Sequence, residues 1–324
     1  MTDSFFLGAN SADGFYSLYG EFCRGERDYL SVIKGGPGTG KSSFMRKIGR
    51  RAEELGFDAE YVLCSGDPDS LDGVYIPDLH RGWVDGTAPH VSEPGKFGVD
   101  GDYVNLSVFC RTPLESEDAC EASALYDAYR ARYSKAYAYL KAAKAIRGTE
   151  TIPLITDIAD IFSEAAPGRG SVSKRFLRCI SGAGEIVLSE AIRYCSRVLF
   201  ISDADTAGIL EAAKQSREDL IQYLSPLSPE NTDAMIIPRR SLAFVNAELN
   251  FSKETNASSL ASKMKRRKID KEQKGLMNAA ILELSEAKRL HDLLEEVYKK
   301  YMDYPALDDF TEKYIDELFD QKTS

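Results

Sequence analysis

One short stretch constrains the fold more than any other part of the chain: GGPGTGKS, residues 35–42. It follows YLSVI, a short apolar run of β-forming residues, and it leads into KSSFMRKIGRRAEELG, whose apolar residues recur at helical spacing. A strand, a glycine-rich turn and a helix in this order are the context that the Walker A motif GxxxxGK[ST] requires. The sequence therefore predicts an α/β fold of the P-loop NTPase type.

The residue types of this loop fit a polyphosphate. Glycines let backbone N–H groups turn toward phosphate oxygens, and the N-terminus of the following helix adds a positive dipole end. Lys41 is predicted to reach the β- and γ-phosphates, and the Ser42 hydroxyl to bind Mg²⁺. A glycine-rich structural turn is the alternative. The predicted nucleotide-binding residues are Gly35, Gly36, Pro37, Gly38, Thr39, Gly40, Lys41, Ser42 and Ser43.

A phosphate-binding loop needs a carboxylate for the metal, placed at the end of a neighbouring buried strand. Asp85 follows a short apolar run in RGWVDGTAPH, so we predict it as the second Mg²⁺ ligand; an ordinary turn aspartate is the alternative. Thr87 and His90 follow closely enough to orient around the γ-phosphate, or to serve as capping or surface residues. We assign Lys41, Asp85 and His90 to the predicted catalytic set.

The segment SGDPDSLDG carries three further acids, Asp67, Asp69 and Asp72. Its composition is typical of a turn, and in a loop beside the phosphates these acids could also touch Mg²⁺ through water. Asp85 is followed by Gly86, where a fast hydrolase would place a glutamate that positions water. The sequence therefore indicates slow hydrolysis, phosphoryl transfer to another group, or a switch.

The pattern of the first half returns in the second half. FFLGANSADGFYSLY resembles RFLRCISGAGEIVLS, YLSVIKGGPGTGKS matches RVLFISDADTAGIL, and CSGDPDSLDGVYIPDLHRGWVD matches SPLSPENTDAMIIPRRSLAFVN. A fourth match pairs YLKAAKAIRG with ELSEAKRLHD. Segments matched in the same order predict two tandem P-loop-like units with mainly parallel sheets, at 1–168 and 169–324. Strand–helix units that share only a pattern are the alternative.

The second copy of the loop lacks the residues that would bind phosphate and Mg²⁺. Ile209 stands at the position of the lysine, Leu210 at that of the serine, and Asn246 at that of the metal-binding aspartate. Asp203 and Asp205 would repel a phosphate there, and no lysine would neutralise it. We therefore expect the second unit to keep the fold without a nucleotide.

Long helices are predicted outside the two cores. Residues 115–147, within an insertion at about 114–148, and residues 276–304 have helical composition and periodicity, and a last helix follows. Tyrosines at helical spacing in the first helix favour helix packing over base stacking. The basic cluster 263–274 favours a solvated helix face, and contact with nucleic acid, an acidic partner or phosphates across the unit interface is the alternative. Arg239 or Arg240 could act as an arginine finger.

The overall composition limits the partners. The 324 residues carry a formal net charge of −10, which argues against a dedicated nucleic-acid coat but allows a local basic patch. No apolar run approaches the length that spans a bilayer, and the N-terminal residues lack the regions of a signal peptide. The six cysteines form no CxxC pair and the three histidines cannot build a His-rich metal site. We expect a cytoplasmic protein with buried thiols.

The chain resembles a family of bacterial P-loop proteins that are described only as predicted ATPases or nucleotide-binding proteins. The resemblance rests on IKGGPGTGKSSFMRKIG, CSGDPDSLDGVYIPDL, VDGTAPHVSEPG and the late EAKRLHDLLEEVYKKYMD, and it covers nearly the whole chain. It implies a tandem duplication, nucleotide binding at residues 35–42 and an active site that includes residues 85–90. It implies no substrate, and the degenerate second loop departs from the fuller family pattern.

These observations combine into one expected function. The first unit is expected to bind ATP, in preference to GTP, with Mg²⁺ and to hydrolyse it slowly, while the second unit regulates, docks a protein partner or completes the site. A small-molecule kinase with an acceptor near Asp67, Asp72 and His90 is one alternative. A non-catalytic scaffold whose partner affinity changes with the nucleotide is the other. A nucleic-acid partner and the oligomeric state stay open.

Overall fold

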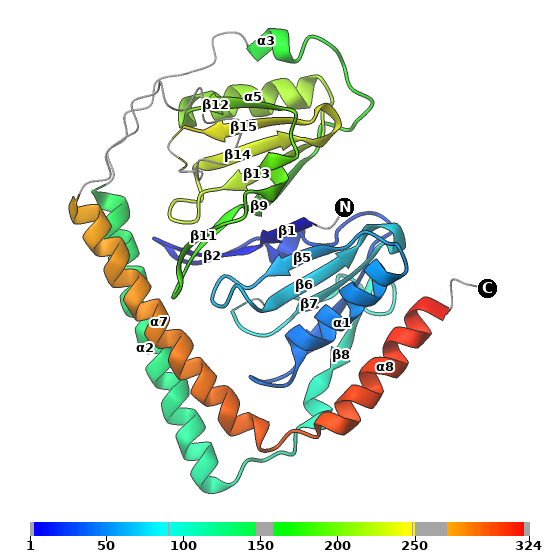
Figure 1. Cartoon of the computed structure of the whole chain (residues 1–324), viewed down its shortest axis with the longest axis vertical. Coiled ribbons are helices and arrows are strands. Elements are labelled where there is room, and N and C mark those ends of the chain that lie inside the picture. The colour runs from blue at the N-terminus through cyan, green and yellow to red at the C-terminus, as the bar shows by residue number, and fades with distance from the viewer. Residues whose placement is uncertain (1–2, 90, 147–157, 248, 250–270, 321–324) are drawn as a thin grey trace.

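The computed structural model describes residues 3–89, 91–146, 158–247, 249 and 271–320, and shows an α/β protein built on one large mixed sheet (Figure 1). Its eleven strands lie in the order β12-β15-β14-β13-β9-β1-β5-β6-β7-β4-β8. The first half supplies β1 (Asp3–Phe6), β4 (Tyr29–Lys34), β5 (Glu60–Leu63), β6 (Leu71–Ile76), β7 (Arg81–Asp85) and β8 (Gly101–Asn105). The second half supplies β9 (Val172–Phe176), β12 (Arg197–Ile201), β13 (Leu220–Leu224), β14 (Thr232–Ile237) and β15 (Leu242–Asn246).

The prediction of mainly parallel sheets is wrong: five of the ten neighbouring strand pairs are antiparallel. Residues 77–80 alone join β6 to β7, and residues 238–241 alone join β14 to β15. Parallel neighbours need a crossover of about a dozen residues or more, so these short connections force antiparallel pairing. The strand that leads into the glycine-rich loop, β4, is nevertheless flanked by two parallel neighbours, β7 and β8.

Three kinds of element surround the sheet. The helices α1 (Lys41–Glu54) and α5 (Asp203–Gln215) follow β4 and β12, and α3 (Ile158–Ile161) and α4 (Glu190–Arg193) are single turns. The long helices are α2 (Ser116–Ala145), α7 (Lys271–Lys299) and α8 (Tyr304–Asp320). Two small hairpins, β2 (Gly8–Ser11) with β3 (Gly14–Ser17) and β10 (Arg178–Ser181) with β11 (Gly184–Val187), lie outside the main sheet.

The two halves repeat one another strand for strand. The order β1-β5-β6-β7-β4 has its counterpart in β9-β13-β14-β15-β12, and β5–β6 and β13–β14 share a register shift at the same position. Details of the small hairpins also recur: the Ser11 hydroxyl donates to the Gly14 carbonyl, and the Ser181 hydroxyl donates to the Gly184 carbonyl. One local sequence pattern therefore folds twice in the same way.

The junction of the halves fixes their relative direction. β1 and β9 are antiparallel and meet where Phe6 lies opposite Phe176. Because equivalent strands then run in opposite directions, the halves are related by an approximate two-fold rotation. The C-terminal ends of β4 and β12 therefore point in opposite directions along the strand axes.

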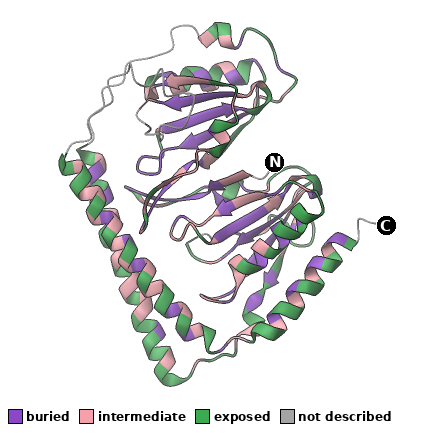
Figure 2. Cartoon of the chain, in the orientation of Figure 1, coloured by how far each residue is buried: buried purple, intermediate pink, exposed green. Residues whose placement is uncertain are grey.

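The C-terminal helix α8 packs against the first half of the chain. Phe44 and Ile48 of α1 share an apolar cluster with Trp83 of β7 and Leu307 of α8. The Trp83 indole N–H donates to the Tyr314 hydroxyl of α8 at 2.9 Å. Helix α1 therefore lies between the buried strands and α8, which hold its N-terminal end in place (Figure 2).

The long helices α2 and α7 form an antiparallel pair that runs along one side of the molecule (Figure 1). Tyr126, Tyr129, Tyr133 and Tyr137 of α2 form a row of ring contacts, whereas Tyr139 is exposed. The first four tyrosines therefore serve helix packing, as their spacing predicts.

Helix α7 crosses the tips of both small hairpins. A cluster of Ala12, Ile180 and Leu284 joins the hairpins to the helix. At Gly182 the hairpin comes so close that an added Cβ would lie 2.6 Å from the Ser285 Cα. The middle of α7 is therefore fixed at the junction between the two halves.

None of the helices in the described ranges is long and apolar enough to span a bilayer. All six cysteines are free thiols, but only Cys179 is buried. Cys120 is exposed and the other four are partly buried, so the expectation of buried thiols is correct only in part.

We predict that Gly182→Ala lowers the free energy of unfolding by about 1–3 kcal/mol, because the new methyl group meets the backbone of α7. Gly275→Ala is the matched control: this helical glycine of α7 has open space around it, so alanine should stabilise the fold by up to about 1 kcal/mol. Urea unfolding of both variants measures the difference. Equal stabilities would contradict the contact between hairpin and helix.

Candidate functional site

The glycine-rich loop, residues 35–40, lies between the C-terminal end of β4 and the start of α1, as the sequence predicts. Gly38 and Gly40 have φ angles of 68° and 83°, which residues with a side chain rarely adopt. The Thr39 hydroxyl donates to the Gly36 carbonyl at 2.8 Å and thereby closes the turn. The loop is therefore a compact turn at the entrance of a helix.

Lys41 and Asp85 lie together beside this loop. In the parallel pair β4–β7, Ile33 lies opposite Asp85, so the last residue of β7 is next to the end of β4. The Lys41 ammonium is 3.7 Å from Asp85 Oδ2 and donates to the carbonyls of Gly35 and Gly36, each at 2.9 Å. Both side chains are nearly buried. A lysine and a carboxylate predicted from distant segments thus meet at one point.

The two oxygens of Asp85 have different surroundings. Oδ1 accepts hydrogen bonds from the Thr87 backbone N–H and hydroxyl, at 2.8 and 2.6 Å. Oδ2 faces the Lys41 ammonium and accepts no hydrogen bond from another side chain in the described ranges. Thr87 therefore orients the carboxylate and leaves one oxygen toward the loop.

Ser42 lies at the first turn of α1 and faces β6. Its hydroxyl oxygen accepts a hydrogen bond from the Leu71 backbone N–H at 2.9 Å. This contact connects the first turn of α1 to the loop between β5 and β6, which carries Asp67 and Asp69. A serine hydroxyl and an aspartate oxygen are oxygen ligands of the kind that Mg²⁺ prefers.

The N-termini of α1 and α5 differ in the way their backbone N–H groups are satisfied. Helix α5 has a complete capping box, in which Ser202 and Asp205 exchange side-chain and backbone hydrogen bonds. Helix α1 begins at Gly40 with no side-chain cap and with no acidic residue in its first turn. The second copy thus holds its own carboxylate where the first copy leaves an uncapped helix end, which favours an anion.

The second half has no loop comparable to residues 35–40, because Ser202 alone joins β12 to α5. The sequence match of Ile209 with Lys41 is therefore wrong: Lys41 is the first residue of α1, whereas Ile209 is the seventh residue of α5 and is buried in the core. Asn246, at the position of Asp85, donates its amide N–H to Asp203 at 2.9 Å and to the Thr232 carbonyl at 3.0 Å. The Asn246 amide is therefore hydrogen-bonded to acceptors of the protein itself, and Ile209 serves core packing.

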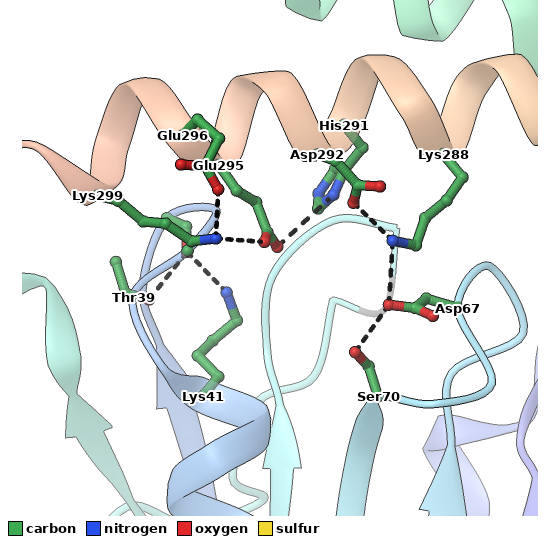
Figure 3. A network of polar contacts seen from close by, with 12 residues as sticks. Thr39, Lys41, Asp67, Ser70, Lys288, His291, Asp292, Glu295, Glu296 and Lys299 are labelled. Atoms are coloured by element: carbon green, nitrogen blue, oxygen red, sulfur yellow. Dashed lines mark hydrogen bonds and ion pairs between the residues drawn. The ribbon is translucent and has the colours of Figure 1, made fainter.

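Helix α7 covers the outer side of the first loop, which the sequence did not predict (Figure 3). An added Cβ at Gly38 would lie 3.1 Å from the Glu295 carbonyl, and one at Gly36 would lie 3.8 Å from the Tyr298 ring. The Tyr304 hydroxyl donates to the Gly38 carbonyl at 3.0 Å. Gly38 is therefore constrained both by its positive φ and by the backbone of α7, whereas the contact at Gly36 is of ordinary length.

Polar side chains of α7 reach toward the same region. The Lys288 ammonium is 2.5 Å from Asp292 Oδ1 and 3.4 Å from Asp67 Oδ2, and His291 Nδ1 is 3.7 Å from Glu295 Oε1 (Figure 3). Their segment, EAKRLHDLLEEVYKKYMD, belongs to the resemblance noted in the sequence, but nothing local in it indicated contact with the loop.

The surroundings of His291 favour its neutral form. Burial lowers the pKa of the imidazole, the carboxylates of Glu295 and Asp292 oppose this, and the ammonium groups of Lys288 and Lys41 lower the pKa further. Among these groups, Lys41 lies at the loop, and its positive charge has the smallest effect on the His291 pKa.

Asp67, Asp69 and Asp72 make different contacts. Asp67 accepts a hydrogen bond from the Ser70 hydroxyl at 2.9 Å. The Asp69 carbonyl accepts one from Arg46 at 2.5 Å. Asp72, predicted in a turn, lies instead in β6, where it is buried and accepts from the Tyr19 hydroxyl at 2.6 Å.

Several predicted residues lie elsewhere or outside the described ranges. His90 is outside them, as are residues 263–270 of the basic cluster. Arg239 and Arg240 both bind the buried Glu218. They follow β14, seven strand positions from β4, which at the usual strand spacing is roughly 34 Å. Neither arginine can serve as a finger for the loop of its own chain.

Two cavities lie away from the loop. One of about 180 Å³ is lined by residues of β1, β5 and β9, where Arg175 donates to Asp3 and Glu60 at 3.2 and 3.0 Å. The other, of about 280 Å³, borders Asp28 and His80, which contact each other at 3.2 Å. We place the candidate site at the loop, where Lys41 and Asp85 converge.

No protein-family model matches the chain, and no curated protein or solved structure is significantly similar to it. The family resemblance therefore stays an expectation, and function is inferred from the residues around the loop. Among the described residues, no three or more His, Cys, Asp or Glu side chains gather in a way that could hold a metal by themselves.

The pairing of Glu218 predicts how stability depends on pH. Burial alone would raise the pKa of Glu218, but hydrogen bonds from Arg239 and Arg240 outweigh it and hold the pKa below its ordinary value of 4.5. A carboxyl with a lowered pKa stabilises the fold above its unfolded pKa, and this contribution is lost as the pH falls through the folded pKa. We expect Glu218→Gln to lose less stability than the wild type as the pH drops below 4.5.

Urea unfolding at pH 7 and at a series of pH values below 4.5 measures this difference. Glu54→Gln, which removes an exposed carboxylate paired with Arg51 on α1, serves as the control. The same pH dependence in the wild type and in Glu218→Gln would show that the arginine pair does not act on this group.

Proposed function

We propose that the chain binds Mg-ATP at residues 35–43, on a P-loop formed by the β4–α1 connection. The observation that carries this proposal is the uncapped N-terminus of α1, beside which Lys41 and Asp85 converge. A helix N-terminus with inward-facing N–H groups and a nearby ammonium favours a polyphosphate. The capped and acidic start of α5 supports one such site in the chain, not two.

The residues around the loop suit Mg²⁺ as the cofactor. Ser42 and Asp85 Oδ2 would hold the ion, and Thr87 would keep the carboxylate oriented. The ion would offset charge on the phosphates when it is bound. Lys41 would exchange its hydrogen bonds with the loop carbonyls for the β- and γ-phosphate oxygens.

Slow hydrolysis is the reaction that these groups support best. Gly86 follows Asp85, so this position offers no carboxylate that could position water. Asp67 already pairs with Ser70 and Lys288, and the buried Asp72 accepts from Tyr19, so neither is placed to orient the acceptor of a kinase. ATP binding with slow turnover, and with a second half that holds no nucleotide, is therefore the preferred function.

We predict that Lys41→Ala weakens Mg-ATP binding at least tenfold, because a charge-assisted hydrogen bond to phosphate contributes about 1.5–3 kcal/mol. Steady-state phosphate release should fall to background in the same variant. Calorimetric titration and a phosphate-release assay on the purified full chain measure both quantities.

Lys47→Ala is the matched control, since this lysine lies on the same helix and pairs with the exposed Asp308. It should leave binding and turnover unchanged. Binding that survives Lys41→Ala, or a wild type that binds no nucleotide, would contradict the proposal and leave the loop as a structural turn. Binding without turnover would support the switch-like alternative.

A further inference from the structure

Helix α7 presents one face to the phosphate-binding loop. Lys288, His291, Glu295 and Tyr298 are spaced by three, four and three residues, so they lie on the same side of the helix. Two of the four positions are in close approach to loop glycines, as the Glu295 backbone is to Gly38. His291 and Lys288 therefore lie on the same face of α7, about one and two turns before Glu295.

The Lys288 end of this face of α7 lies near the segment that contacts Ser42. Lys288 reaches Asp67, which precedes β6, and the first residue of β6 donates its backbone N–H to Ser42. The metal and the terminal phosphate would occupy this side of a bound nucleotide, because Ser42 and Asp85 face it. Lys288 and His291 approach this region from α7, whereas Lys41 extends from the start of α1 (Figure 3).

Both side chains retain hydrogen-bonding capacity. The Lys288 ammonium has three N–H donors, and within the described ranges it contacts two carboxylates, those of Asp67 and Asp292. The described contact of the His291 ring nitrogens with a carboxylate, that of Glu295, is 3.7 Å long, beyond a hydrogen bond. An anion between α7 and the loop would find donors that the protein itself uses incompletely.

We propose that Lys288 and His291 contact the terminal phosphate of the nucleotide, so that α7 distinguishes ATP from ADP. This inference rests on the proposed nucleotide site and adds residues of α7 to it. Helix α7 follows the second half of the chain and crosses the hairpins at the junction of the halves. The same helix therefore contacts both the loop and the junction between the halves.

The test is calorimetric titration of Mg-ATP and Mg-ADP into the full-length wild type, Lys288→Gln and His291→Gln. Each variant is expected to bind ATP about tenfold more weakly, the usual effect of losing one charge-assisted hydrogen bond, while its affinity for ADP changes less than about twofold. Lys288→Arg should restore most of the preference for ATP. Arg289→Gln is the matched control, because its described partner is Glu286 on the same helix.

The outcomes separate this inference from the proposed function. If the wild type binds neither nucleotide, the proposed site itself fails. If the wild type binds and Lys41→Ala does not, but Lys288→Gln and His291→Gln keep the wild-type ratio of ATP to ADP affinity, the contact with the terminal phosphate is wrong. Equal weakening of both nucleotides would likewise overturn it and assign the two residues to the packing of α7.

Discussion

A helix N-terminus must satisfy backbone N–H groups that have no partner within the helix, and the two halves of this chain meet that constraint differently. In the second half, Asp205 and Ser202 fill the start of α5 with the protein's own side chains. In the first half, α1 begins at a glycine with no side-chain cap, next to Lys41. The proposed function follows from this difference. The start of α1 favours a bound anion, whereas the start of α5 already holds the Asp205 carboxylate of the protein itself.

The antiparallel contact between β1 and β9 determines how the halves can cooperate. It makes β4 and β12 run in opposite directions at separate places in one continuous sheet, so the start of α5 cannot complete the site of the first half. Helix α7 instead returns from the second half along α2, crosses the junction at Ser285, and ends over Gly36 and Gly38. One continuous helix thus contacts both the junction and the loop, which is why we place the proposed contact with the terminal phosphate there.

Local patterns predicted much of the first half correctly. The strand that contains YLSVI is β4, Asp85 is the last residue of β7, and the internal similarity of the sequence corresponds to two matching sets of strands. These features depend on neighbours in sequence, on hydrophobic periodicity and on turn chemistry. The convergence of Lys41 and Asp85 follows from them once β4 and β7 are parallel neighbours.

The features that were missed depend on long-range pairing. The short connection at residues 77–80 could have indicated an antiparallel β6–β7 pair, but the motif drew attention to a parallel sheet. The amphipathic pattern of α7 predicts that one face is buried but does not predict which segment covers it. The sequence therefore does not indicate that Lys288 and His291 lie near the loop. Arg239 and Arg240 were assigned by assumed symmetry, and the actual two-fold relation carries them away from the loop.

The most direct test of the account is the stoichiometry of Mg-ATP binding to the full-length chain, measured by calorimetric titration at known active concentration. An uncapped α1 and a self-capped α5 predict one nucleotide per chain. Two nucleotides per chain would show that the start of α5 also binds phosphate despite its capping box. No bound nucleotide would show that the glycine-rich loop serves only the turn and the passage of α7.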